Sequence, residues 1–202
     1  MSGFTGTMFE SLYSYAQAAT TTTPTAGAVT ITGGYPSIEI PGNFFVKTGK
    51  YSSTTRLKLR GQLTTTATIP TWLFGLAWTQ GMPATFATAN VLAATAAFTP
   101  GVAATGAWFD LEADITLRTL GLGAASVLLT AGYLACPGAF PAATYTPAAG
   151  PIQTLPATGV SGASTASIDC DQPLFIWPYL TLGAATAGNT VSLQKVKMWG
   201  EN

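Results

Sequence analysis

Hydrophobic and polar residues alternate along several stretches of the chain with the two-residue period of a β-strand. The strictest alternation runs from Trp108 to Thr119. Its apolar positions are Phe109, Leu111, Ala113, Ile115 and Leu117, and its polar positions are Asp110, Glu112, Asp114, Thr116 and Arg118. The segment from Arg56 to Arg60 repeats the pattern, with basic residues between leucines. Both segments are therefore predicted to be strands with one buried and one polar face.

Further strands are predicted over residues 38–40, 72–78, 127–134, 174–182 and 191–199. Residues 72–78 are apolar at every position, so we expect this strand inside the protein or in a subunit interface. Residues 186–189 have the composition of a hairpin turn between the last two strands. A long uncharged region rich in Pro, Ala, Gly and Thr at 137–167 is predicted to be a loop. The pattern predicts an all-β fold, a jelly-roll-like β-sandwich over residues 38–202.

Residues 1–37 differ from the rest of the chain. Large apolar side chains punctuate a polar segment that runs into a threonine run and Pro24, and they are Phe4, Phe9, Leu12, Tyr13 and Tyr15. Large apolar side chains are unfavourable in water unless another part of the protein or a partner covers them. One interpretation is an extended N-terminal arm that docks on a neighbouring subunit, with these residues in an assembly interface. The other is a first strand packed on its own domain, and the pattern supports both.

Charge is scarce in this chain of 202 residues. Charged residues make up 8%, against about 25% in ordinary soluble domains. Eight basic residues balance eight acidic ones, and none lies between Arg60 and Asp110 or between Arg118 and Asp169. Neither charge density nor charge imbalance keeps separate copies apart in solution. We expect much of the surface to be covered by copies of the chain or by another protein.

A mean hydropathy of +0.35 raises the possibility of a membrane protein. The uncharged stretch 119–136 has the length of a membrane span, but glycine and polar residues dilute it and Pro137 ends it. It is therefore interpreted as a buried strand region. The N-terminal residues lack the basic start of a signal peptide, so no export is expected. Without export, Cys136 and Cys170 are interpreted as small buried hydrophobic residues in preference to a disulfide.

Six of the sixteen charges fall in two triplets, Arg56, Lys58, Arg60 and Asp110, Glu112, Asp114. If their strands are neighbours, the triplets form a ladder of opposite charges. If they belong to different subunits, they set the register of assembly and form an interface. Two solvated strand faces are the simplest alternative. Alternate acids on a strand have a spacing compatible with paired catalytic acids, but nothing else in the sequence supports catalysis.

The residue inventory argues against most site chemistry. The chain has no histidine, which removes most zinc, iron and copper sites and the commonest general base. Neither an oxygen-rich calcium loop nor a phosphate-binding glycine loop is present. Basic residues are too sparse for nucleic acid. We therefore expect no catalytic residues, no metal, no cofactor, no nucleic acid and no membrane partner.

The five tryptophans lie in or at the ends of predicted strands, and they are Trp72, Trp78, Trp108, Trp177 and Trp199. Packing in the core and in subunit interfaces is the favoured interpretation. The alternative is that one or two of them form a platform for stacking sugars at the rim of the sandwich.

Three motifs carry a resemblance to a protein family. The first runs from Ile40-Pro41-Gly42-Asn43-Phe44-Phe45 through Gly49-Lys50 into the basic strand that ends at Gly61. The second is the segment Trp108–Gly121, and the third is Asn189-Thr190-Val191-Ser192-Leu193. Together they span roughly residues 40–199, and the sequence resembles virion structural proteins of tailed bacteriophages.

The resemblance implies a small non-enzymatic jelly-roll protein of a phage particle, made in the bacterial cytoplasm. A capsid decoration protein is the main expectation: a homotrimer that cements the shell through contacts with the major capsid protein. A tail or fibre module that recognises a host surface glycan is the alternative.

Overall fold

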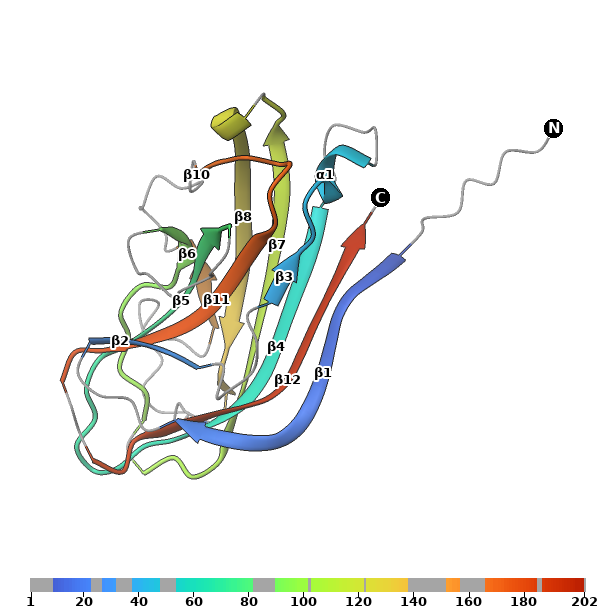
Figure 1. Cartoon of the computed structure of the whole chain (residues 1–202). Helices are drawn as coiled ribbons and strands as arrows, with labels where there is room; N and C mark the ends of the chain where they lie inside the picture. The colour runs from blue at the N-terminus through green and yellow to red at the C-terminus, as the bar shows by residue number, and fades with distance from the viewer. Residues whose placement is uncertain are drawn as a thin grey trace.

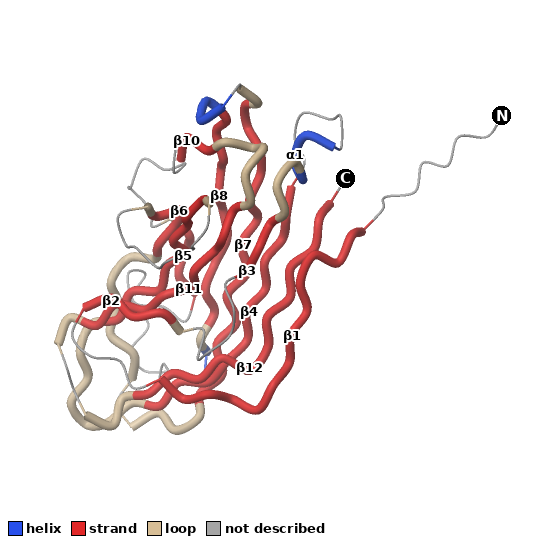
Figure 2. Tube along the Cα trace, in the orientation of Figure 1, coloured by secondary structure: helices blue, strands red, loops and turns tan. Residues whose placement is uncertain are grey.

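The computed structural model describes residues 9–22, 27–31, 38–47, 54–81, 90–101, 103–121, 123–137, 152–156, 166–184 and 187–201. Two antiparallel β-sheets pack face to face and enclose the hydrophobic core (Figures 1 and 2). The predicted all-β, jelly-roll-like sandwich is confirmed.

The larger sheet has seven strands, and every pairing in it is antiparallel. Its order is β1 (Phe9–Thr22), β12 (Thr190–Glu201), β4 (Thr54–Thr64), β7 (Ala107–Thr119) and β8 (Ser126–Ala135). Two short strands, β9 (Ile152–Leu155) and β10 (Ala166–Ile168), lie one after the other along the remaining edge of β8.

The smaller sheet has five strands. β11 (Leu174–Leu182) pairs on one side with β5 (Trp72–Gln80), which continues to β6 (Val91–Ala94). On its other side β11 pairs with β2 (Gly27–Thr30) and β3 (Ile38–Ile40). The helical elements among the described residues are single turns, α1 (Phe44–Lys47) and η1 (Gly123–Ala125). No helix within the described ranges is long and apolar enough to cross a membrane.

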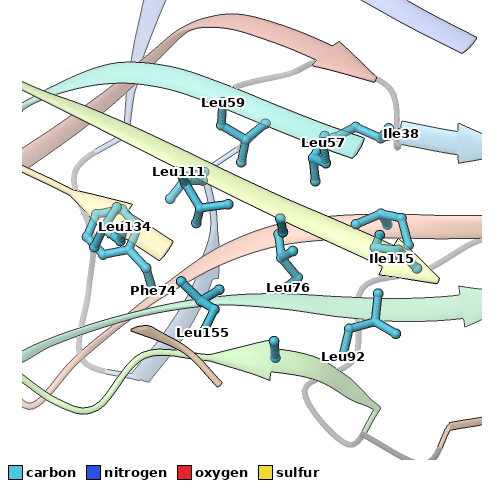
Figure 3. Close-up of a cluster of buried hydrophobic side chains, with 14 of the residues drawn as sticks. Ile38, Leu57, Leu59, Phe74, Leu76, Leu92, Leu111, Ile115, Leu134 and Leu155 are labelled. Atoms are coloured by element: carbon cyan, nitrogen blue, oxygen red, sulfur yellow. The ribbon is translucent and has the colours of Figure 1, made fainter. Parts of the chain in front are cut away.

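Apolar positions predicted from the alternation fill the space between the sheets (Figure 3). Leu59 and Leu111 from the large sheet and Leu76 from the small one are fully buried. Phe74 stacks its ring against Phe98 at 6.2 Å and packs against Phe109 at 5.2 Å. Burying each large apolar side chain stabilises the fold by roughly 1.5–3 kcal/mol. The buried faces therefore dictate which strand faces turn outward.

The N-terminal segment corresponds to the second of its two interpretations where it is described. Residues 9–22 form β1, which pairs with β12 of the same chain from Phe9 opposite Glu201 to Thr22 opposite Val191. Threonine favours strands, so the threonine run continues the strand. Docking of this segment on a neighbouring subunit stays a prediction. Phe4 and the side chains of Phe9, Leu12, Tyr13 and Tyr15 lie outside what the structure describes.

The region expected to be a loop at 137–167 contains β9 and the first two residues of β10. β9 buries Gln153 and Leu155 and exposes Ile152. Its two apolar residues therefore lie on opposite faces of the strand, and the sequence shows no apolar side. Its flanks are rich in Pro, Ala and Gly, which hid the strand in the sequence.

The hairpin expected between the last two strands is wrong, because β11 and β12 belong to different sheets. Asn189 holds the turn that precedes β12. Its side-chain oxygen accepts a hydrogen bond from the backbone N–H of Thr66 at 3.0 Å, and its amide donates to the carbonyl of Thr68 at 3.2 Å. These bonds hold the turn against the β4–β5 connection.

Three neighbouring strands of the large sheet bend together at one end (Figure 1). The pairing of β1 with β12 shifts between Ala16 and Thr20, and that of β12 with β4 shifts between Leu193 and Lys195. Such bulges bend a strand and increase its twist. Gly61 of β4 lies at this level, opposite Leu193. The straight part of the sheet beyond the bend carries the polar outer face described next.

Candidate binding face

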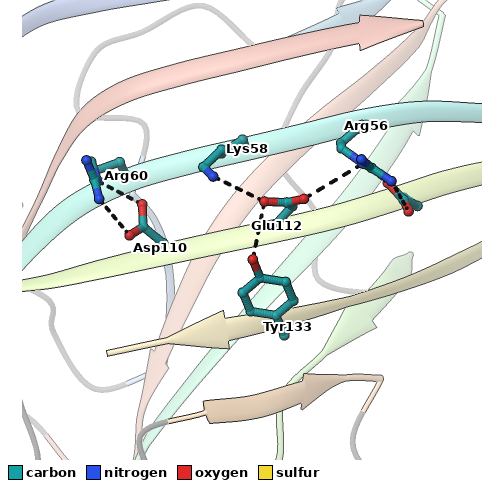
Figure 4. A network of polar contacts seen from close by, with 7 residues as sticks. Arg56, Lys58, Arg60, Asp110, Glu112 and Tyr133 are labelled. Carbon is teal, nitrogen blue, oxygen red and sulfur yellow. Dashed lines mark hydrogen bonds and ion pairs between the residues drawn. The ribbon is translucent and has the colours of Figure 1, made fainter. Parts of the chain in front are cut away.

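The outer face of the large sheet carries the two charged triplets as one ladder inside a single chain (Figure 4). β4 and β7 are neighbours, and their register places each basic residue directly opposite an acidic one. The pairs are Arg56 with Asp114, Lys58 with Glu112 and Arg60 with Asp110. Intervening residues such as Leu57 and Leu111 are fully buried. Burial of the intervening apolar residues therefore turns all six charges toward solvent.

Both arginines bind their carboxylates through two parallel hydrogen bonds. Arg56 donates from Nε to Asp114 Oδ1 at 2.6 Å and from Nη2 to Oδ2 at 2.9 Å. Arg60 makes the same pair of bonds to Asp110 at 2.8 and 3.0 Å. The hydrogen bond to Asp110, together with its charge, raises the pKa of Arg60. Such two-point contacts fix side-chain orientation as well as contributing energy.

Glu112 connects the middle of the ladder to the next strand. Its carboxylate accepts a hydrogen bond from Lys58 Nζ at 3.2 Å and lies 3.8 Å from Arg56 Nε. The hydroxyl of Tyr133 on β8 donates to the same carboxylate at 3.3 Å (Figure 4). The polar face thus extends as one network over β4, β7 and β8. Its role in assembly stays a prediction.

Trp108 is the exposed tryptophan of this face. It lies on β7 with 45% of its surface accessible, and the guanidinium carbon of Arg60 lies over its ring at 5.5 Å from the centroid. Because Asp110 holds Arg60, the indole has a fixed neighbour. An aromatic ring in contact with water beside fixed polar groups is typical of a recognition surface.

The other tryptophans are more buried. Trp72 is fully buried in the core, as the packing interpretation predicted, and Trp78 packs partly against it. Trp177 on β11 donates from its indole nitrogen to Thr79 at 2.9 Å. Trp199 on β12 lies under Lys197, whose Nζ is 5.1 Å from the ring centroid. Of these four, Trp199 lies on the strand next to the ladder.

Two lysines that the sequence did not single out complete the face. Lys195 lies directly opposite Arg60, and Lys197 directly opposite Lys58, across the β12–β4 pairing. The four side chains line a hollow of about 140 Å³. Their Lys-x-Lys alternation resembles that of 56–60, but only the order of the strands reveals that the two basic rows are adjacent.

On the side away from β12, exposed side chains of β8 and β9 form an apolar margin of the face. Leu129 and Tyr133 of β8 and Ile152 of β9 are 36%, 40% and 63% exposed. Tyr133 lies opposite Glu112, and Leu129 opposite Thr116, which places both on the outer side of the sheet. From β12 to β9 the face therefore changes from cationic to paired charges to apolar.

The acids of the ladder are paired, and both cysteines are buried. The three acids of the ladder each have a basic partner within 3.2 Å. The described residues contain no group of three or more acidic or cysteine side chains placed to hold a metal ion. Both cysteines are buried free thiols, and burial raises the pKa of Cys136 to about 12, so that thiol is a poor nucleophile.

Comparisons with known proteins find structural likeness alone. No protein-family model and no curated protein matches the chain. Among solved structures, it is similar to the CBM2 module of the evolved Dit of Lactobacillus casei BL23 phage J-1, with 13% identity, 96% of each chain covered and a TM-score of 0.40. It is also similar to the metal-free form of lectin I-B4 from Griffonia simplicifolia, with 11% identity and a TM-score of 0.36. That match covers 96% of this chain and 93% of the lectin chain.

Proposed function

We propose that this protein is a non-enzymatic recognition module of a bacteriophage particle, which binds a host surface glycan through the outer face of its large sheet. The placement in a virion rests on the sequence motifs that resemble tailed-phage structural proteins. The observation that supports glycan recognition is the exposed Trp108, held beside the Arg60–Asp110 pair.

The side chains of this face are complementary to the groups of a sugar. The C–H face of a pyranose packs on an aromatic ring, which Trp108 offers. Sugar hydroxyls donate to carboxylates and accept from basic groups, and the ladder presents both in alternation. Because the ion pairs already hold these side chains, binding costs little additional ordering.

A glycan array with the intact protein, followed by titration of the best glycan, tests this proposal. Trp108→Ala is expected to weaken binding at least about tenfold, the equivalent of about 1.4 kcal/mol. Trp108→Phe keeps a ring and is expected to retain part of the affinity. Trp177→Phe, on the opposite sheet, is the matched control and should bind like the unmodified protein. Equal affinity of Trp108→Ala and the unmodified protein would exclude this face as the glycan site.

Capsid decoration is the second candidate function, and the apolar margin favours it. Ile152 and Leu129 expose apolar surface on a chain with few charges to keep copies apart. Burial of such surface against another subunit contributes about 25 cal/mol per Å². In this form the protein would assemble as a homotrimer and contact the major capsid protein, with the charge ladder and residues 1–24 near the contacts.

Two measurements separate the candidates. Light scattering gives the mass in solution, and a trimer is expected for the decoration protein. Sedimentation with purified particles then compares the unmodified protein with Ile152→Glu. Loss of particle binding by Ile152→Glu with glycan binding retained would favour decoration. Glycan binding without any association to the shell would favour the recognition module.

A further inference from the structure

The hollow on the outer face is lined by four cations from two neighbouring strands. Lys58 and Arg60 come from β4, and Lys195 and Lys197 from β12. Five of the eight basic residues of the chain lie on these two strands: these four and Arg56, which precedes Lys58 on the same face of β4. For a protein this poor in charge, that is a strong concentration of one sign.

The register of β12 against β4 places these cations opposite one another, which is unfavourable in the free protein. Lys195 faces Arg60 and Lys197 faces Lys58 in direct cross-strand pairs, and like charges in such pairs repel. The three carboxylates of β7 are within hydrogen-bond reach of the β4 side chains. Among the described residues, no carboxylate forms an ion pair with Lys195 or Lys197.

The strand on the other side of β12 supplies no counter-charge at these positions. β1 pairs Ala16 with Lys195 and Ser14 with Lys197. The acidic residue of β1, Glu10, pairs with Gly200 further along. Both lysines are exposed, so an anion from solution can reach them.

We propose that the hollow between β4 and β12 binds a carboxylate or phosphate group of an acidic glycan whose neighbouring sugar packs on Trp108. This inference rests on the proposed glycan recognition and specifies its ligand class. Arg60 connects the two parts, because it lines the hollow and lies over the Trp108 ring. An anionic group in the hollow removes the repulsion between the opposed cations.

The acidic row of β7 separates this ligand class from nucleic acid. Asp110, Glu112 and Asp114 run beside the hollow on the adjacent strand. A backbone with a phosphate at every nucleotide would place anions against these carboxylates. A glycan with neutral sugars between its charges would instead offer hydroxyl donors to them. The face therefore fits spaced negative charge.

Binding measurements on four polymers test the inference. Hyaluronan carries a carboxylate on every second sugar, a phosphomannan carries phosphodiesters between neutral sugars, dextran is neutral, and a DNA duplex is a dense polyanion. Titrations of the intact protein at 50 and 300 mM NaCl compare all four. We expect at least one of the first two polymers to bind tenfold more tightly than dextran and to weaken in high salt. The preference between these two identifies the anionic group.

Single charge removals locate the site. Lys195→Gln and Lys197→Gln are each expected to weaken binding of the preferred acidic polymer about threefold to tenfold and to leave dextran binding unchanged. Arg118→Gln removes one exposed positive charge from β7 away from the hollow, and it is expected to have no effect. Thermal melts of all three variants check that they fold.

Each other outcome overturns the inference in a recognisable way. Equal weakening by Arg118→Gln and Lys195→Gln would mean a general charge effect. DNA binding that is as tight as that of the acidic glycans, with the same lysine dependence, would mean a general polyanion site. Glycan binding that depends on Trp108 but not on either lysine would overturn the anion site and leave the proposed function intact. Binding of no glycan at all would overturn both.

Discussion

Lys195 is a residue whose effects on folding and on binding should have opposite signs. It faces Arg60 across the β12–β4 pairing, and a pair of like charges opposite each other is destabilising by roughly 0.2–1 kcal/mol. Lys195→Gln is therefore expected to raise the free energy of unfolding by up to this amount in low salt, as measured by urea denaturation. The gain should shrink in high salt, because salt screens exposed charges.

Arg118→Gln is the control for this stability prediction, because it removes an exposed charge outside the hollow. A Lys195→Gln variant that is less stable than the unmodified protein in low salt would contradict the prediction.

Cys136 should make stability fall in alkaline solution. Burial raises the pKa of its thiol from 9.0 to about 12, so above pH 9 the unfolded chain releases this proton more readily than the folded one. The stability present below pH 9 is lost as the pH rises toward 12, by at most about 1.4 kcal/mol per pH unit. Urea denaturation at pH 8 and pH 10 measures the loss.

Cys136→Ala is the matched variant for this pH dependence. It should lose less stability between the two pH values, whereas burial of Tyr179, which also raises a pKa, acts equally in both proteins. An identical loss in the two proteins would contradict the assignment to Cys136.

For single residues, the sequence predicts well which face of its strand a side chain lies on, and predicts poorly which residue of a neighbouring strand it contacts. The alternation around Arg56–Arg60 and Asp110–Asp114 places every one of those charges on the outer side, because the intervening apolar residues are buried. It could not place Lys195 beside Arg60, since that contact depends on the order of the strands and not on either strand alone.

At the scale of the element, Gly61 shows why β4 needs a residue without a side chain at its bend. A Cβ atom there would meet the carbonyl oxygen of Ser192 on β12 and the ring of Phe109 on β7. Gly61→Ala is expected to lower the free energy of unfolding by about 1–3 kcal/mol, the usual effect of overpacking. Chemical denaturation measures the change.

Gln62→Ala, at the next position of β4, is the control for Gly61→Ala and should change stability much less. A Gly61→Ala protein as stable as this control would mean that the strands can separate at the bend without cost.

Short strands mark the limit of sequence prediction for elements. β4, β5 and β7 have long alternating or wholly apolar patterns, and the sequence predicts them. β6 and β9 have four residues each, and unlike the shorter β3 neither alternates apolar with polar residues. Ile152 faces outward and Gln153 inward, so β9 also violates the expected polarity. Its place is set by its pairing with β8.

At the scale of the whole molecule, the position of β1 changes what removal of the N-terminal segment should do. Deletion of residues 1–24 takes away the partner of β12 and leaves a sheet edge with unpaired backbone groups. We expect a markedly lower melting temperature and a tendency to aggregate. An independent arm, the other interpretation of this segment, would instead leave the domain folded.

Deletion of residues 1–8 alone is the control for this truncation, because it keeps β1 entire. This shorter protein should melt like the full chain. If the two truncated proteins melt at the same temperature as the full chain, β1 contributes nothing to the sandwich.

β1 and β12 run antiparallel side by side, and Phe9 lies opposite Glu201. The described chain therefore begins and ends at one end of the large sheet, while the strands of the candidate binding face extend from that end toward the bend (Figure 1). Another protein joined to either end would be attached at the same place, and the face would point away from the side of that attachment. Several copies gathered around a common stalk would then present a ring of lateral faces, which suits a ligand lying parallel to the stalk.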